Sequence, residues 1–246
     1  MLAQLNGRFC IANAILAGLP AEEFASVRPR LHAVLLEESA ILHESRKRIE
    51  HVYFVESGVV SLRTVTSGSI LEAAMIGRQG ATGISVVLGC EQSPYQSTVL
   101  LPGRALRIHV DDLQQTMQER PLIREHVLRH LYASIVHCLQ TSLCGARHGP
   151  EARLACWLCV ACDMLHSEIL SITHEDVSIA LGLRRSGVTE SLIRFEEQGL
   201  LRKMRGLLEV TDRNGLQHKA CDCYPVITSA YDAAKRLCGS KDGALV

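Results

Sequence analysis

The chain has 246 residues, of which 47% are hydrophobic and 21% are charged, a composition that excludes a disordered or low-complexity protein. Its 26 Lys and Arg side chains are balanced by 26 Asp and Glu side chains, so a nucleic-acid partner has to be recognised from local patterns rather than from net charge. The apolar runs are too short to span a bilayer, and the opening stretch MLAQLNGRFCIANAILAGLP lacks the features of a secretory signal. We therefore expect a cytoplasmic protein without a membrane partner.

The first predicted elements are a short helix and a series of strands. Residues 20–27 begin with proline and carry two acids in the first turn, which favours a helix. From residue 27 to 110, short apolar runs alternate with glycine turns, and one interruption falls at Ser57-Gly58. Strands of this length and spacing predict an antiparallel barrel or sandwich.

Beyond Asp111 the apolar residues take the period of a helix. A seam with alternating steps of three and four residues is formed by Leu128, Leu131, Ile135, Cys138 and Ser142. Such a seam is typical of a helix that pairs with a second helix in a dimer, although packing on its own domain gives the same pattern. Gly149-Pro150 then interrupts the helix, which predicts a boundary between domains near this point.

The stretch SITHEDVSIALGLRRSGVTESLIRFEEQGLL contains two short helices separated by Gly182. Thr173 is a good N-cap for the first helix, and Asp176 is placed for a capping box. The second helix begins near Ser186. Helices too short to be stable alone hold each other and leave one face free to enter a DNA groove. The pattern therefore predicts a helix-turn-helix.

Two arginines, Arg184 and Arg185, stand where the second helix begins. In a helix-turn-helix this end meets base edges, and an arginine can donate two hydrogen bonds to O6 and N7 of guanine. The alternative is a pair of solvated arginines, which the helix dipole slightly disfavours. The next segment, LLRKMRGLLEVTD, predicts a β-hairpin with Arg202, Lys203 and Arg205 at its tip. A basic hairpin in this place suits phosphate contacts as a wing.

In these features the chain resembles the Crp/Fnr superfamily of bacterial transcription regulators. The resemblance rests on IEHVYFVESGVVSL in the strand region, RHGPEARLACWL between the two parts, and THEDVSIALGLRRSGVTESLIRFEEQGLL in the reading motif. It implies an α+β chain with an N-terminal jelly-roll barrel of the cyclic-nucleotide-binding type, a long dimerisation helix and a C-terminal winged helix-turn-helix. The corresponding predicted domains are residues 1–112, 113–148 and 149–246.

The resemblance further implies a homodimer that binds a palindromic operator in double-stranded DNA and works with RNA polymerase. It places Arg185 at the family's guanine-reading arginine, with Ser186 and Glu190 at the other two base-contact positions. Cyclic-AMP-dependent members tend to have an acid and a second arginine there, so a different operator is expected. The full predicted DNA-binding set is Arg184, Arg185, Ser186, Thr189, Glu190, Arg194, Arg202, Lys203 and Arg205.

The predicted effector pocket departs from the family pattern. Nucleotide-binding members carry a Gly-Glu pair for the ribose and an Arg-Ser or Arg-Thr pair for the cyclic phosphate. Here Gly83-Ile84 replaces the first pair, and no arginine lies between Arg78 and Arg104. A buried phosphate without arginine lacks its charge-assisted partner, which argues against the usual mode of cyclic-nucleotide binding. The candidate pocket residues are Gly80, Thr82, Gly83, Ile84, Ser85, Gln96, Ser97 and Thr98; the small-molecule effector, if one exists, is left open.

The ten cysteines are expected to be free thiols, as is usual in the cytosol. Cys10 alone does not provide the N-terminal cysteine cluster with which oxygen-sensing relatives hold iron and sulfur. A second group, Cys156, Cys159 and Cys162, recurs along a predicted helix without a fourth ligand, which favours small buried side chains over a cluster. Cys221 and Cys223 are interpreted as structural, with zinc or a thiol switch left open. No cofactor or metal is predicted.

Histidines and catalytic motifs complete the sequence predictions. His130 and His137 are expected to be solvated or at the dimer interface, with pH or haem sensing as an alternative, and His148 to form a hydrogen bond between the domains. No nucleophile elbow, phosphate-binding loop or carboxylate pair indicates an enzyme. The alternative functions are a haem, nitric-oxide or redox sensor of the same fold, and a ligand-binding or protein-interaction module with a vestigial DNA reader.

Overall fold

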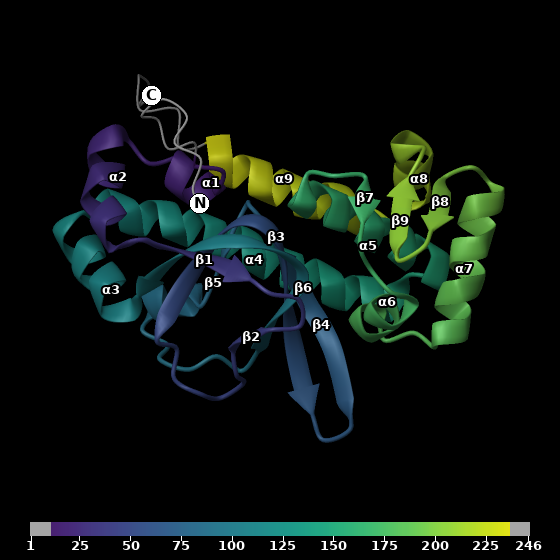
Figure 1. Cartoon of the computed structure of the whole chain (residues 1–246), viewed down its shortest axis with the longest axis horizontal. Coiled ribbons are helices and arrows are strands. Elements are labelled where there is room, and N and C mark those ends of the chain that lie inside the picture. The colour runs from purple at the N-terminus through teal and green to yellow at the C-terminus, as the bar shows by residue number, and fades with distance from the viewer. Residues whose placement is uncertain (1–10, 237–246) are drawn as a thin grey trace.

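The computed structural model describes residues 11–236 and shows an α+β chain in two parts (Figure 1). Cys10 lies outside the described residues. The N-terminal part contains α1 (Ala14–Ala17), α2 (Ala21–Val27), the 3-10 turn η1 (Arg28–Arg30), β1 (His32–Leu36), β2 (Ile41–His43), β3 (His51–Thr66), β4 (Ser69–Ile76), β5 (Ala81–Thr82), the 3-10 turn η2 (Ile84–Leu88), β6 (Gln96–His109) and α3 (Val110–Glu119). The short helix predicted over residues 20–27 is present as α2.

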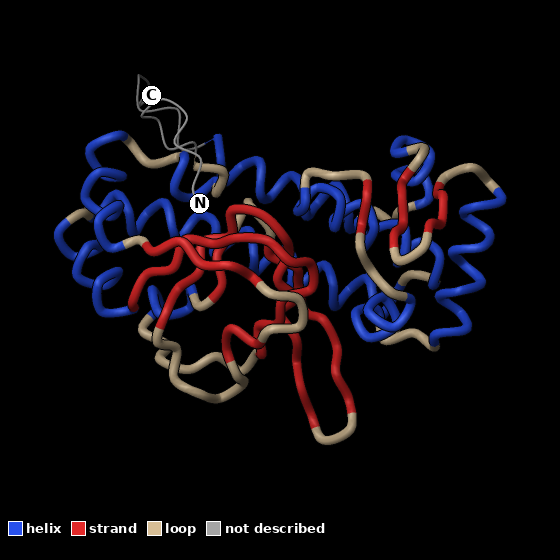
Figure 2. The backbone as a smooth tube through the Cα atoms, in the orientation of Figure 1, coloured by secondary structure: helices blue, strands red, loops and turns tan. Residues whose placement is uncertain are grey.

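The strands of the N-terminal part form one antiparallel sheet in the order β1-β6-β3-β4, with β2 paired to β6 and β5 to β3. This sheet curls into the barrel (Figure 2). The interruption predicted at Ser57-Gly58 is not a turn, because β3 continues through it with an irregular register against β6. Gly58 has a φ of +83°, and an added Cβ would lie 2.5 Å from the carbonyl oxygen of Leu101. Glycine therefore lets the long strand bend against its neighbour.

The long helix α4 (Pro121–Arg147) connects the two parts and runs beside the last helix, α9 (Cys223–Arg236), as Figure 1 shows. Proline at its first turn suits a helix start. Side chains such as Ile123 and Val127 pack into the core of the N-terminal part. Further along, His137 on α4 and Tyr231 on α9 pack edge to face. Two different partners therefore bury one face of α4.

The C-terminal part contains α5 (Pro150–Leu165), β7 (Ile169–Leu170), α6 (His174–Leu181), α7 (Arg185–Glu197), β8 (Leu201–Met204), β9 (Leu207–Val210), α8 (Arg213–Lys219) and α9. A small antiparallel sheet has the order β7-β9-β8. The core of the C-terminal part includes Leu154, Leu192 and Phe195, all at most 1% exposed. Helix α5 supplies the buried centre on which α6, α7 and α8 pack.

A buried carboxylate joins the barrel to the C-terminal part. Glu72 on β4 accepts hydrogen bonds from the indole Nε1 of Trp157 on α5 at 2.7 Å and from the hydroxyl of Ser61 at 2.5 Å. Burial raises the pKa of Glu72, and the hydrogen bonds from Ser61 and Trp157 act in the opposite direction. Nearby, Leu71 lies against Gly182 at the end of α6. The hairpin of β3 and β4 therefore contacts the first helix of the predicted DNA reader.

Candidate nucleic-acid interface

Helix α6 begins and ends where its sequence predicts. The hydroxyl of Thr173 accepts a hydrogen bond from the backbone N–H of Asp176 at 3.1 Å, and the Asp176 carboxylate accepts one from the N–H of Thr173 at 2.9 Å. This is a complete capping box. Gly182, with a φ of +59°, ends the helix in the left-handed conformation that glycine adopts without strain. These local rules fix the turn that leads into α7.

Helix α7 presents a polar face to solvent. Its buried side is formed by Val188, Leu192 and Phe195. Four of the predicted base-contact side chains are exposed on or just before its first turns: Arg184, Arg185, Ser186 and Glu190. Thr189 is half-buried, because its hydroxyl donates to the carbonyl of Arg185 at 2.9 Å and lies 2.9 Å from Nδ1 of His174. The beginning of α7 is therefore free to meet a ligand, whereas the Thr189 hydroxyl already has partners.

The predicted DNA-binding cations divide into two groups. Three of them form ion pairs inside the chain: Arg194 with Glu151, Arg202 with Glu209 at 2.5 Å, and Lys203 with Glu196 at 2.8 Å. The hydrogen bonds from Lys203 lower the pKa of the exposed Glu196 carboxyl. Among residues 11–236, Arg184, Arg185 and Arg205 have no such ion-pair partner. These three guanidinium groups are the ones available to a phosphate or a base without breaking an internal ion pair.

A hollow of about 300 Å³ lies between the start of α7 and the wing, which is the hairpin of β8 and β9. Arg185 and Lys203 contribute to its wall, together with His174. The pKa of His174 is lowered by its burial and by the neighbouring charges of Lys203 and Arg185. The hollow therefore has positive side chains and no acidic side chain in its wall, which suits the approach of an anionic backbone.

The comparison with family models finds the Crp-like helix-turn-helix domain over residues 152–219, which contain α6, α7 and the wing. Solved structures with the same fold include FixK2 from Bradyrhizobium japonicum, with a TM-score of 0.69 and 15% identity over 78% of this chain and 98% of that one. The chain carries a Crp-like reader on a Crp/Fnr fold. A mutant of CooA from Carboxydothermus hydrogenoformans has a TM-score of 0.59 and 18% identity, covering 80% of this chain and 91% of the other.

These comparisons confirm the resemblance to the Crp/Fnr superfamily and the predicted fold class. Residues 152–219 are thus similar to the helix-turn-helix domain of Crp-like proteins, and the chain as a whole shares the Crp/Fnr fold. A third structure of this fold is the c-di-GMP-responsive global regulator CLP of Xanthomonas campestris, with a TM-score of 0.59 and 14% identity over 78% of this chain and 99% of that one. A search of curated proteins found no similar sequence. No helix within residues 11–236 is long and apolar enough to cross a membrane.

The members of the predicted seam on α4 differ in exposure. Leu128 and Leu131 are half-buried against the barrel core, Cys138 is half-buried, and Ile135 and Ser142 are exposed. Beside them, large apolar side chains form what we call the α4 apolar stripe: Tyr132, Ile135, Leu139 and Leu143. Tyr132 and Leu139 are 67% and 63% exposed. This side of α4 is therefore apolar, and nothing within residues 11–236 covers it.

A cavity of about 270 Å³ lies between the barrel and α4. Five of the predicted effector residues line it, namely Thr82, Gly83, Ile84, Ser85 and Ser97, whereas Gly80, Gln96 and Thr98 lie outside its wall. His43 is a titratable side chain in this wall, with Nδ1 3.3 Å from Thr82 Oγ1 and Nε2 2.8 Å from the carbonyl oxygen of His51. Burial lowers the pKa of His43. Sequence reasoning did not find His43, which lies far from the other wall residues along the chain.

The two α4 histidines are not solvated, so that expectation is wrong. His130 and His137 are 1% and 3% exposed and lie under α9. Nδ1 of His137 is 3.3 Å from the hydroxyl of Tyr231, and Nδ1 of His130 is 3.1 Å from the carbonyl of His126. Burial lowers the pKa of each to about 4. Both side chains are therefore neutral at pH 7, and no local pattern around them indicated that a C-terminal helix covers them.

The three cysteines of α5 are buried, as expected of small apolar side chains: Cys156, Cys159 and Cys162 are at most 4% exposed. Burial raises the pKa of Cys159 to about 12. His148 has the expected hydrogen-bond contact between the parts, with Nδ1 3.6 Å from Sγ of Cys223. Sequence reasoning missed that Cys144 also lies beside Cys221, although the spacings C-x3-H and C-x-C were there to be read.

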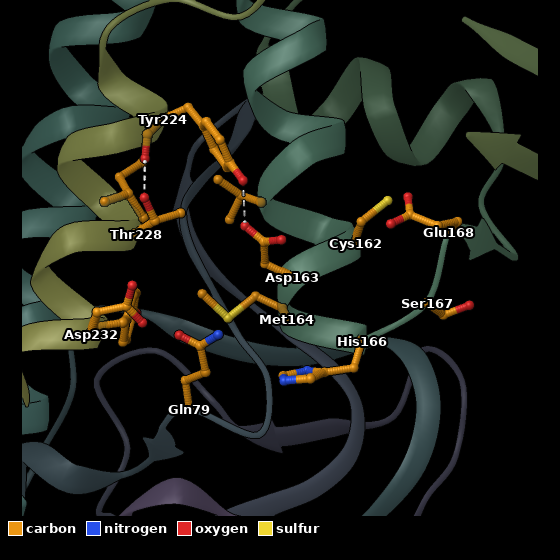
Figure 3. Close-up of a pocket in the computed structure, with 13 residues that line it drawn as sticks. Gln79, Cys162, Asp163, Met164, His166, Ser167, Glu168, Tyr224, Thr228 and Asp232 are labelled. Atoms are coloured by element: carbon orange, nitrogen blue, oxygen red, sulfur yellow. Dashed lines mark hydrogen bonds between the residues drawn. The ribbon is translucent and has the colours of Figure 1, made fainter. Parts of the chain in front are cut away.

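A larger hollow of about 580 Å³ lies between α5 and α9 (Figure 3). Its wall contains the carboxylates of Asp163, Glu168 and Asp232. Asp163 accepts hydrogen bonds from Arg213 at 2.6 Å and from the hydroxyl of Tyr224 at 2.9 Å. Burial raises the pKa of Asp163, and Arg213 acts in the opposite direction. A wall with three carboxylates repels a phosphate backbone, so this hollow is a poorer candidate for a nucleic-acid interface than the surface of α7 and the wing.

Proposed function

We propose that this Crp/Fnr-type regulator is a non-enzymatic, cytoplasmic homodimer that reads a palindromic operator through α7 and the wing. RNA polymerase is the further protein partner. The barrel senses a small molecule or has lost its effector. The observation that carries the proposal is the position of Arg184 and Arg185, exposed and without an internal ion pair among the described residues, where the reading helix begins.

The division of the cations refines the predicted interface. Arg185 is the base-reading residue that we propose, because a guanidinium that forms no internal pair can be directed at guanine without exposing a carboxylate. Arg205, at the tip of the wing between β8 and β9, is the best-placed phosphate contact. Arg202 and Lys203 can bind phosphate only if their ion pairs with Glu209 and Glu196 are weakened or broken. Their contribution to affinity should therefore be smaller.

The α4 apolar stripe supports the dimer. Ile135 and Leu139 are 45% and 63% exposed on this helix face. Covering these apolar side chains removes them from water, which is favourable. A second copy of α4, packed by twofold symmetry, covers the stripe with the same residues. Such a dimer also places two α7 helices for the two halves of a palindrome.

The barrel cavity supports a neutral ligand or none. Its wall is made of apolar groups, His43 and the hydroxyl-bearing side chains of Thr82, Ser85, Ser93, Tyr95, Ser97 and Ser134, without an arginine or lysine. An anionic phosphate held there would lack a cationic partner. Because Ile135, Cys138 and Leu139 of α4 also line the cavity, an occupant would contact the helix that we propose for dimerisation.

Sequence selection from random duplex DNA tests the proposal. The purified chain should enrich a palindromic site, and its affinity should fall steeply with salt. Enrichment of no sequence at any ligand or salt condition would contradict the DNA-reading function. Full biological activity of an Arg184→Ala/Arg185→Ala double variant would instead favour the interaction module with a vestigial reader.

Analytical ultracentrifugation of a Leu139→Asp variant tests the dimer. A carboxylate in a paired apolar seam is desolvated without a partner, so the dimer dissociation constant should rise at least about tenfold. The matched control is Leu35→Asp, which changes a 73% exposed leucine on β1, away from α4. Equal dissociation constants for the two variants would show that the stripe is not the dimer contact.

The haem sensor is not favoured by the α4 histidines that suggested it. His130 and His137 are enclosed between α4 and α9, and Nδ1 of each already lies within hydrogen-bond distance of a partner. Neither histidine is among the residues that line the barrel cavity.

A further inference from the structure

Four metal-ligating side chains meet where the long helix ends. The ligand atoms of Cys144, His148, Cys221 and Cys223 all lie within 4.8 Å of one another. The three cysteines are buried, at 8%, 9% and 1% exposure for Cys144, Cys221 and Cys223. Three thiols and an imidazole converging in a buried place form a donor set that soft and borderline metal ions prefer.

The separations fit a tetrahedral zinc ion. With Zn–S near 2.3 Å and Zn–N near 2.0 to 2.1 Å, tetrahedral angles place sulfur atoms about 3.8 Å apart and sulfur and nitrogen about 3.6 Å apart. Sγ of Cys144 lies 3.4 Å from Sγ of Cys221, and Nδ1 of His148 lies 3.6 Å from Sγ of Cys223. These two separations are close to the tetrahedral values, and all four ligand atoms lie within 4.8 Å of one another, near enough to converge on one ion.

Local structure brings the two pairs of ligands together. Cys144 is in the last turn of α4 and His148 is its C-cap, so a spacing of four residues puts both on one side of the helix end. The backbone N–H of His148 donates to the carbonyl of Cys144 at 3.1 Å, which holds this end in shape. Cys221 lies in the connection after α8, and Cys223 begins α9. Segments far apart in sequence thus each contribute two ligands.

We propose that Cys144, His148, Cys221 and Cys223 bind one structural zinc ion that fastens the end of α4 to the start of α9. Four protein ligands leave no open position, which is the form of a structural rather than a catalytic zinc site. The site goes beyond the proposed reading of DNA, and its existence does not depend on that function.

Cys156 is the nearest rival as a ligand, because its thiol also approaches those of Cys144 and Cys221. It is not part of the set whose atoms all lie within 4.8 Å, which takes His148 instead. The pKa of the Cys221 thiol is lowered mainly by its hydrogen bond with Cys144 and then by that with Cys156. Cys156 is therefore interpreted as a neighbouring thiol that can donate a hydrogen bond to a coordinated sulfur.

The position of the ion gives it a structural consequence. α9 covers the buried side of α4, including His137, and the four ligands join the end of one helix to the beginning of the other. Zinc bound there adds its binding free energy to this packing. Its removal should loosen α9 and lower the melting temperature of the C-terminal part.

Metal analysis of the full chain is the test. Protein produced with zinc in the medium, purified under reducing conditions and dialysed should contain about one zinc ion per chain. Cys221→Ser and Cys144→Ser should lose the ion, whereas Cys156→Ser and Cys159→Ser, which change buried thiols outside the set, should retain it. Replacement of zinc by cobalt should give the visible absorption of a tetrahedral site with thiolate ligands. His148→Gln, which keeps every thiol, should weaken binding of cobalt at least about tenfold.

Several outcomes overturn the assignment. Wild-type protein without metal after reconstitution under reducing conditions would do so, as would equal zinc in the wild type and the two ligand variants. A metal-free chain lighter by two hydrogen atoms, with Cys144 and Cys221 joined in a peptide map, would show a disulfide instead. Loss of zinc from Cys156→Ser but not from His148→Gln would reassign the fourth ligand. Metal content is measured without DNA, so failure of the zinc site leaves the reading function standing, and the reverse also holds.

Discussion

The helix-turn-helix with its wing, residues 173–210, which we call the reading head, can be interpreted from its sequence far more fully than the barrel cavity can. In the reading head, consecutive residues form the cap, the turn, the helix start and the wing, so a short stretch around Arg185 specifies both structure and chemistry. The wall of the barrel cavity comes from β2, β3, β4, β5, η2, β6 and α4, and in the sequence it extends from His43 to Leu139. A contact surface on one helix can be predicted from a short stretch of sequence, whereas a cavity lined by residues far apart in the sequence cannot.

The largest predicted effect comes from α4, which lines the barrel cavity and packs against α9 of the C-terminal part. The pKa of His130 and of His137 falls from 6.5 to about 4 on folding, because burial penalises the charged imidazole. For His130, the neighbouring His126, Lys235 and Arg129 add smaller repulsions. Between pH 4 and pH 6.5 the unfolded chain binds more protons than the folded chain. The free energy of unfolding is therefore highest above pH 6.5, and it falls by about 3 kcal/mol per histidine as the pH drops toward 4.

Urea unfolding at pH 7 and pH 5 measures this effect. A His137→Gln variant should lose part of the pH dependence, because glutamine does not titrate. The same pH dependence in the variant and the wild type would show that His137 is not buried neutral. Such a result would also question the packing of α9 on α4.

A smaller effect is expected from Gly83→Ala in the barrel. Gly83 has a φ of +82°, and an added Cβ would lie 2.7 Å from the carbonyl oxygen of His51 and 2.9 Å from the ring of His43. We expect a loss of about 2 kcal/mol in the free energy of unfolding. The control is Gly89→Ala, which has a φ of +83° and open space around the new Cβ. Operator preference should be unchanged in both, and equal stabilities would refute the close contact at Gly83.

In the reading head, Arg185→Ala should change DNA binding and leave stability unchanged, the reverse of the result expected for Gly83→Ala in the barrel. Loss of a two-bond contact to guanine should weaken binding to the selected operator by about 1 to 3 kcal/mol and relax preference at one base pair per half-site. Thermal stability should change little, because Arg185 is exposed. Arg194→Ala is the control, since Arg194 is already paired with Glu151. Fluorescence anisotropy with matched and mismatched duplexes measures the difference, and an unchanged base preference would remove Arg185 from the interface.

The smallest effect is predicted for Arg205→Ala at the tip of the wing. A lost phosphate contact should weaken all duplexes about equally and reduce the salt slope by about one. Lys203→Ala should have the same kind of effect but a smaller one, because Lys203 is paired with Glu196 at 2.8 Å. Binding isotherms at several salt concentrations separate the two variants. A larger change for Lys203 would show that its ion pair opens on DNA.

Much of the fold could be predicted from sequence because it follows local rules. The Thr173 capping box, Gly182 and the apolar positions of α7 define the reader without knowledge of distant contacts. Ser57-Gly58 misled because glycine serves a bulge as well as a turn. The interaction of α9 with α4, which buries His137, depends on packing between residues almost a hundred positions apart in the sequence. The same is true of the meeting of Cys144 with Cys221.

The Glu72 carboxylate, shared by Ser61 of the barrel and Trp157 of α5, has a consequence for protein engineering. A C-terminal fragment cut at residue 148 would leave the indole N–H of Trp157 without its acceptor and uncover an apolar surface on α5. A chimera that takes its reader from another regulator would leave Glu72 buried without the indole donor. Grafting between relatives should therefore exchange the β3–β4 hairpin together with the reader, so that the acid and its donor are always inherited as a pair.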